Sequence, residues 1–221
     1  MRIGMPSRGP FPTPVERSNA LTGAEHSRIE LHAHPRISLP ETPSGPSYRS
    51  HSVVLDVGFQ SHSGALEGAT LATAIFIVLL YRHSGQAEFS MGVNNALEPE
   101  FRKPRLVHIE LSENPVLSHV LGQVGDQLRG LSIAPADSGD APAPNVIFAF
   151  GIGLVDGKPW AFDESTEFAA ELASAGDRST LTLRYDPARF SEEWVREFAD
   201  QYAVLACEID ESSDRLLSEF S

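Results

Sequence analysis

The chain has 221 residues, enough for one domain of ordinary size with a short additional segment. Apolar residues make up 41% of the sequence and charged residues 21%, which is typical of a soluble globular protein. The net charge of −13 is uneven, because residues 51–221 hold 11 basic and 26 acidic residues and so carry −15. An acidic folded part lacks the lysines and arginines that neutralise phosphates, so we expect neither nucleic acid nor an anionic membrane as a partner.

The cysteine content and the N-terminal sequence limit the kinds of site and the cellular compartment that we expect. The single cysteine, Cys207, excludes an internal disulfide and a zinc site built from cysteines. The first residues lack the apolar run of a signal peptide. We therefore expect a cytoplasmic protein.

The N-terminal segment is rich in proline, serine and glycine. Residues 1–47 contain eight of the sixteen prolines, which favour extended, solvated backbone. We predict a disordered or extended arm over residues 1–35, in which Ile29–His34 alternates and can form a short edge strand. His32 and His34 would share one face of that strand and could bind a metal with His26, but a solvated segment is the better interpretation.

The stretch from Ser63 to Val93 organises the rest of the chain. Apolar residues recur at three- and four-residue spacing from Leu66 to Tyr81, and Ile75–Leu79 is apolar throughout, so we predict a helix covered on most faces. The apolar part is too short to span a bilayer, because Arg82 follows closely. Gly85 is expected to cap the helix, and a strand is expected to follow.

The remaining elements alternate between strands and helices, which predicts an α/β fold. We expect strands near 52–57, 87–93, 105–111, 145–150 and 179–185, and helices near 65–83, 115–129 and 191–207. Lys158–Phe162 is a possible short strand. Thr166–Ala173 is predicted to be a weak helix or an irregular connection, and Leu131–Pro144 a loop.

Four stretches resemble the C-terminal lobe of nonribosomal peptide synthetase condensation domains. Leu71–Asn95 (LATAIFIVLLYRHSGQAEFSMGVNN) is similar to a buried helix that ends in "LLYRYSGQ" and leads into a strand. Leu106–Leu117 resembles a strand ending "LRVDLSGNPSF", and Leu181–Leu205 resembles the closing strand and helix. Leu39–Pro43, followed by Tyr48-Arg49, is similar to the "LPTDxP…YRG" segment. The resemblance covers about residues 36–221.

The resemblance implies a single lobe of the chloramphenicol-acetyltransferase type: a partial condensation-like domain over residues 36–210 and a tail over 211–221 towards a following domain. Condensation domains catalyse amide formation with a histidine in an "HHxxxDG" phrase on their N-terminal lobe. This chain contains no His-His pair, and its one Asp-Gly, Asp156-Gly157, has no histidine at the required spacing. Two further family phrases, "HQDxPF" and "RxxSxNPxF", are also missing before Pro144–Phe150.

Other enzyme signatures are absent as well: there is no Gly-x-Ser-x-Gly elbow, no phosphate-binding lysine loop and no His-Glu-x-x-His motif. We expect His83 to cap its helix as a cation and His119 to be solvated. We expect His108 to face solvent, the polar face of a neighbouring strand or a cleft, and not the core. Glu164, Glu167, Glu171 and Asp177 are expected to form a solvated acidic patch. We assign no catalytic, cofactor-binding or metal-binding residue.

Three functional hypotheses follow. In the first, the chain is a truncated, non-catalytic condensation-like domain, N-terminal to an adenylation domain, that docks on this domain or on a biosynthetic partner enzyme, with a carrier protein as a further possible partner. A half-domain should then leave an apolar face for its partner. The alternative is an acyltransferase completed by a partner that supplies the histidine lobe. The third hypothesis is a small-molecule binding module.

Overall fold

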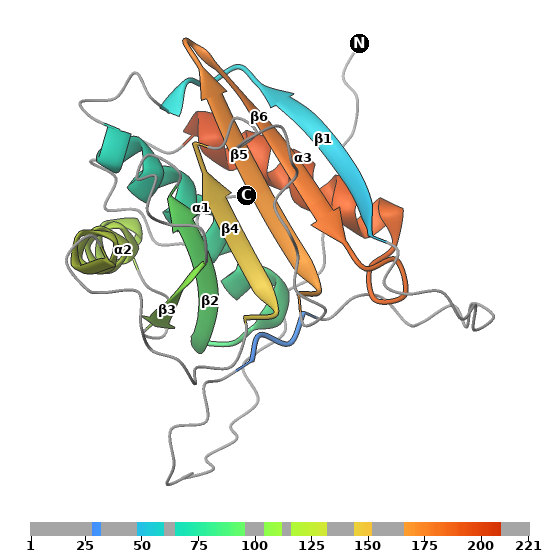
Figure 1. Cartoon of the computed structure of the whole chain (residues 1–221), viewed down its shortest axis with the longest axis horizontal. Coiled ribbons are helices and arrows are strands. Elements are labelled where there is room, and N and C mark those ends of the chain that lie inside the picture. The colour runs from blue at the N-terminus through green and yellow to red at the C-terminus, as the bar shows by residue number, and fades with distance from the viewer. Residues whose placement is uncertain are drawn as a thin grey trace, which may run out of the picture.

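The computed structural model describes residues 28–31, 48–59, 65–95, 104–111, 116–131, 144–151 and 166–208. These residues form one mixed β-sheet packed with three helices, which confirms the predicted α/β class (Figure 1). In chain order the elements are β1 (Arg49–Leu55), α1 (Ala65–Ser84), β2 (Glu88–Asn95), β3 (Arg105–Glu110), α2 (Leu117–Leu131), β4 (Val146–Phe150), β5 (Phe168–Ala175), β6 (Arg178–Tyr185) and α3 (Glu192–Glu208).

The sheet brings together segments that are far apart in the sequence. Its strand order is β1-β6-β5-β4-β2-β3. β4 is parallel to both β2 and β5, whereas β6 is antiparallel to β1 and β5, and β3 is antiparallel to β2. The chain crosses from β3 to β4 through α2. The edge strands are β1 and β3.

Helix α1 is the core helix of the fold. Every side chain from Leu71 to Leu80 is buried, and α1 contacts α2, α3 and β4. Figure 1 shows α1 and α3 on one face of the sheet, with α2 beside α1. The predicted burial on most faces is confirmed. The expectation that this stretch is too short for a bilayer is wrong by length and composition, since Leu66–Ser84 meets both criteria; its burial against the sheet and two helices is typical of a core helix instead.

Aromatic rings fill the layer between the sheet and the helices. Phe76 on α1 lies 5.0 Å from Phe148 on β4 and 5.7 Å from Phe198 on α3, measured between ring centroids. Phe168 on β5 lies 5.1 Å from Phe198 and 5.5 Å from Trp194. These separations and tilted or edge-to-face angles are those at which aromatic pairs attract one another. The cluster ties α1 and α3 to the centre of the sheet.

Glycine ends α1 as predicted. Gly85 has φ +67°, in the left-handed region, and its amide donates to the carbonyl oxygen of Tyr81 at 2.8 Å. A residue in this conformation stops the helix and satisfies one of its last carbonyl groups. The turn leads directly into β2.

One element was predicted wrongly. Phe168–Ala175 is a strand, not a weak helix or an irregular connection, and it pairs with β4 and β6 at once. Its sequence, FAAELASA, consists largely of good helix formers, so local propensity favours the wrong state. Ladders on both sides and the burial of Phe168, Ala170 and Leu172 in the helix-facing layer override that propensity.

The five strands and three helices that were predicted are all present, with shifted ends; β1, for example, begins at Arg49 instead of Ser52. Several predictions concern residues outside the described part of the chain: residues 1–27 and 32–47 of the arm and its continuation, Lys158–Phe162, Asp156-Gly157, Glu164 and the tail over 211–221. Within the arm, Ile29–Leu31 is described and is not part of the sheet.

Candidate functional site

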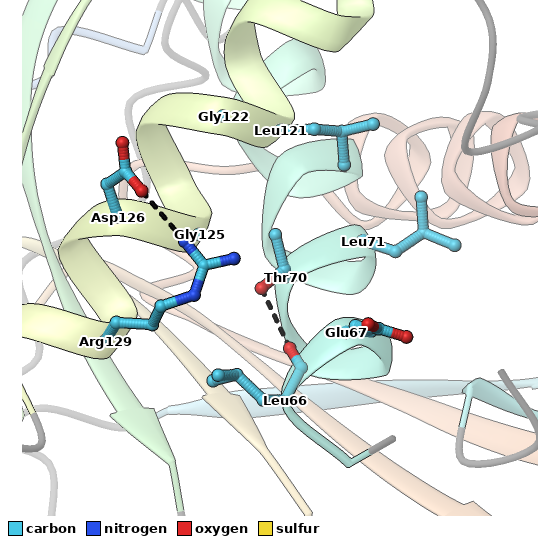
Figure 2. Close-up of a pocket in the computed structure, with 9 residues that line it drawn as sticks. All are labelled: Leu66, Glu67, Thr70, Leu71, Leu121, Gly122, Gly125, Asp126 and Arg129. Atoms are coloured by element: carbon cyan, nitrogen blue, oxygen red, sulfur yellow. Dashed lines mark hydrogen bonds and ion pairs between the residues drawn. The ribbon is translucent and has the colours of Figure 1, made fainter. Parts of the chain in front are cut away.

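A groove of about 410 Å³ lies between the first half of α1 and helix α2 (Figure 2). From α1 it is lined by Leu66, Glu67, Thr70 and Leu71, and from α2 by Leu121, Gly122, Gly125, Asp126 and Arg129. The amphipathic pattern of α2 turns its buried residues, Val120, Val124 and Leu128, towards the core and leaves the groove residues at the boundary with solvent.

The groove combines an apolar floor with an acidic rim. Arg129 Nη1 bonds Asp126 Oδ1 at 2.8 Å, which neutralises one acid, and Thr70 Oγ1 donates to the carbonyl oxygen of Leu66 at 2.8 Å (Figure 2). A Cβ atom on Gly122 would meet nothing within 4 Å, whereas a Cβ atom on Gly125 would lie 3.6 Å from Thr70 Cγ2 on the opposite wall. The lining contains no histidine, cysteine or serine. This chemistry suits binding of an apolar group beside a cation.

The second exposed feature is the sheet face opposite α1 and α3, on which the described residues place no helix. Ser52 and Thr182 hydroxyls lie 3.0 Å apart across β1 and β6 on this face, whereas Ala149 and Asn94 in the same cross-strand row are each only 2% exposed. Val54, 62% exposed, and Val204 on α3, 46% exposed, are the large hydrophobic side chains that stand free in the described residues.

The expected acidic patch is also divided among separate contacts. Glu171, on the helix-free face, lies 3.6 Å from the Arg184 guanidinium. Partial burial raises the pKa of Glu171 above its usual 4.5, and the nearby Arg184 opposes this shift. Glu167 instead contacts Arg189 at 2.7 Å, and Asp177 is exposed in the turn between β5 and β6. These acids serve different parts of the fold.

The arrangement that most resembles a catalytic set lies on β2 and β3. Ser90 and His108 are direct cross-strand partners, with Ser90 Oγ 3.2 Å from His108 Nδ1, and Glu88 Oε1 lies 3.6 Å from the other ring nitrogen. A serine–histidine–carboxylate order is the order of nucleophilic hydrolases. Ser90 is only 4% exposed, however, so its hydroxyl is a buried hydrogen-bond partner of an exposed histidine. The predicted exposure of His108 is confirmed.

His83 has a different role from the one predicted. Its Nε2 lies 3.0 Å from Gln201 Oε1, and its ring centroid lies 5.2 Å from those of both Trp194 and Phe198. Burial lowers the pKa of His83 below its usual 6.5. This burial disfavours the charged ring that was expected to complement the helix dipole. His83 joins α1 to α3.

The other singled-out residues are exposed. His119 lies on the outer side of α2, as predicted, and Cys207 lies on the opposite side of α3 from the buried Tyr202. Within the described residues, no three histidine, cysteine, aspartate or glutamate side chains are grouped as metal ligands would be.

Comparison with known proteins gives no match at the level of sequence: no family model and no curated protein matches this chain. Comparison of structures does. The fold aligns with the X-domain from teicoplanin biosynthesis, in a structure of its complex with OxyB, with a TM-score of 0.59, 15% identity and 87% of this chain covered. It aligns with the starter condensation domain of rhizomide synthetase RzmA with a TM-score of 0.60, 9% identity and 79% of this chain covered.

The chain has the fold of part of a condensation domain. A third neighbour, the condensation domain of the monacolin K polyketide synthase MokA, agrees with a TM-score of 0.58, 12% identity and 90% of this chain covered. The chain spans about half the length of these proteins: 52% of the X-domain chain, 48% of the rhizomide domain and 56% of the MokA domain. The condensation-domain resemblance read from the sequence, and its restriction to one part of that domain, are thus confirmed at the level of fold.

Proposed function

We propose that this chain is a truncated, non-catalytic condensation-like domain that docks on a partner enzyme in natural-product biosynthesis. The observation behind the proposal is the match of most of this chain to about half of a condensation domain. The sequence contains no His-His pair, so the phrase that the resemblance ties to amide formation is missing. One structural neighbour, the X-domain, is found in a complex with the enzyme OxyB, which supports a docking role.

The groove between α1 and α2 is the surface that we assign to docking. Leu66, Leu71 and Leu121 line the groove with apolar side chains, and Glu67 adds a negative charge at the rim that no arginine of the groove neutralises, because Arg129 is paired with Asp126. A partner segment with a large apolar side chain beside a lysine or arginine fits this combination, since complementary charges give orientation and apolar burial gives affinity. The candidate partners are an adenylation domain of the same synthetase, a tailoring enzyme or a carrier protein.

The test is size-exclusion chromatography with light scattering, on this chain alone and mixed with each candidate partner. Gly122→Trp places a large ring at the α2 side of the groove, at a lining position where open space tolerates a side chain. Gly130→Trp is the matched control: it is exposed on the same helix, also has open space, and lies outside the groove. We expect a complex that G122W weakens at least tenfold and G130W leaves intact. If no candidate forms a complex, or if both variants lose the complex equally, the groove is not the docking surface.

An alternative rests on the same half-length match. In that case the chain is one half of an acyltransferase, and a partner supplies the half with the catalytic histidine. Acyl transfer would then appear only when the two halves are mixed, detected by mass spectrometry of the acylated product. Its absence with a partner that binds stably would decide for the non-catalytic role.

A further inference from the structure

A four-residue segment, Arg28–Leu31, lies against the sheet without joining it. Figure 1 shows this short blue segment beside the amino-terminal ends of β4 and β5. Ile29 is 2% exposed and belongs to the main hydrophobic core, whereas Arg28 and Glu30 on either side are exposed. This extended segment inserts the Ile29 side chain into a hydrophobic core that is formed by residues distant in the sequence. That is the geometry of a bound peptide.

Two amide side chains bind the backbone of the segment. Gln86, directly after Gly85, accepts from the Glu30 amide through Oε1 at 2.7 Å and donates through Nε2 to the Arg28 carbonyl oxygen at 3.3 Å. Asn145, just before β4, donates through Nδ2 to the Ile29 carbonyl oxygen at 2.9 Å. Three main-chain groups of residues 28–30 are thus satisfied by side chains from two distant parts of the chain. Such contacts fix an extended backbone whatever its side chains are.

The carboxylate of Glu167 binds the side chain of Arg28, the first residue of the segment. Glu167, whose side chain is only 12% exposed, bonds the Arg28 guanidinium and also the Arg189 guanidinium at 2.7 Å. Asn145 Nδ2 lies 3.4 Å from the second oxygen of Glu167, so the backbone-binding and charge-binding groups are coupled. A sheltered carboxylate between two guanidinium groups forms charge-assisted hydrogen bonds, which are stronger than neutral ones.

We propose that Gln86, Asn145 and Glu167 form a peptide-binding site that recognises Arg–aliphatic–any residue in an extended conformation, and that residues 28–30 are its ligand in cis. The site is distinct from the groove between α1 and α2 and does not depend on the docking role proposed above. Gln86 and Asn145 bind the backbone of the peptide, Glu167 binds its arginine side chain, and the hydrophobic core takes up its aliphatic side chain. The same segment supplied as a separate peptide is therefore a ligand of the site.

The experiment uses the full chain with a protease recognition sequence inserted between Pro43 and Ser44. After cleavage, no covalent bond joins residues 28–31 to the sheet. We expect the N-terminal fragment to remain with the rest of the protein on size-exclusion chromatography at micromolar concentration. In the double variant Gln86→Ala, Glu167→Gln the fragment is expected to separate, because each change removes hydrogen bonds worth about tenfold in affinity. Glu192→Gln, which breaks a glutamate–arginine pair on the surface of α3, is the matched control and should retain the fragment.

Synthetic peptides make the test independent of protein folding. A labelled peptide of residues 24–35 should exchange into the cleaved chain, followed by fluorescence anisotropy. A peptide with Ile29→Asp should not compete, one with Arg28→Ala should compete about tenfold less well, and one with Glu30→Ala should compete as well as the original. Separation of the fragment from the wild-type chain, equal retention in the double variant, or equal competition by the Ile29→Asp peptide would each overturn the proposal.

Discussion

The hydroxyl of Tyr202 on α3 donates a hydrogen bond to the main-chain carbonyl oxygen of Ala72 on α1, at 3.0 Å. Both residues are fully buried, so this contact joins the two helices at the centre of the layer that covers the sheet. Burial raises the pKa of Tyr202 well above its usual 10.0, because an ionised phenol has no stabilising partner there.

Replacing Tyr202 with phenylalanine should lower the free energy of unfolding by about 1 kcal/mol at neutral pH, the net contribution of one hydrogen bond. The variant should also change how the stability of the protein falls at alkaline pH. Because the pKa of Tyr202 is higher in the folded state than in the unfolded state, the wild-type protein loses stability as the pH rises above about 10. Tyr202→Phe removes this part of the loss. Urea midpoints at pH 8 and pH 10.5 measure both effects; Tyr81→Phe, at a half-buried position on α1, should keep the alkaline loss.

His83 should make the stability of the protein fall as the pH falls, at mildly acidic pH, which is the opposite of the dependence caused by Tyr202. Its pKa is lower in the folded state than in the unfolded state, so its contribution to stability is present above about pH 6.5 and is lost as the pH falls through the folded-state pKa. The urea midpoint should fall between pH 7.5 and pH 5.5. His83→Phe should reduce that fall, and His119→Gln, on the exposed side of α2, should not. An equal fall in both variants would show that other groups cause it.

The outer edge of β3 is closed by two glutamines of α2. Gln127 donates to the His108 carbonyl oxygen and accepts from the His108 amide at 3.0 Å, and Gln123 Nε2 donates to the Glu110 carbonyl oxygen at 2.7 Å. Open strand edges template pairing between chains. The double variant Gln123→Ala, Gln127→Ala should therefore self-associate at concentrations at which the wild-type chain does not, as light scattering would show. Gln201→Ala is the control, since that glutamine bonds His83 and Glu197, which lie on helices.

Two glycines should respond in opposite directions to alanine. Gly85→Ala places a Cβ on a residue with φ +67°, and should lower the free energy of unfolding by about 1 kcal/mol although space is available. Gly122→Ala lies inside α2 with open space around the new Cβ, and should raise stability by up to about 1 kcal/mol. Thermal unfolding of the two variants is the measurement. A stabilising Gly85→Ala would contradict the role of Gly85 as the helix cap.

Periodicity was sufficient to predict α1, α3 and the strands with alternating large apolar residues. The inner positions of β6, such as Leu181 and Leu183, can be recognised in the sequence because they alternate with polar residues such as threonine and arginine. β5 gave no such signal, since alanine occupies both its inner and its outer positions. Its assignment depends on the two neighbouring strands, whose pairing is not a local property.

The sites were harder to predict than the fold, for the same reason. Ser90 and His108 meet only because β2 and β3 pair in one particular register. Gln86 and Asn145 converge on the backbone of residues 28–30 across separations of more than fifty residues. The one usable signal was parity: Ser90 and His108 each fall on the outward-facing positions of their strands. The lowered pKa of His83 could not be foreseen, because the rings that surround it come from α3.

The pairing of β1 with β6 has a consequence for the order in which the molecule assembles. Ser52 and Thr182, bonded across these strands, are 130 residues apart, so β1 leaves the ribosome on the order of ten seconds before its partner at ordinary rates of synthesis. During that interval α1 has been made, while β4, β5, β6 and α3, which shield its apolar surface, are incomplete. Native contacts that close such long loops form slowly. Yield in the cell should therefore depend on chaperones that hold the nascent α1, more than on the equilibrium stability of the finished protein.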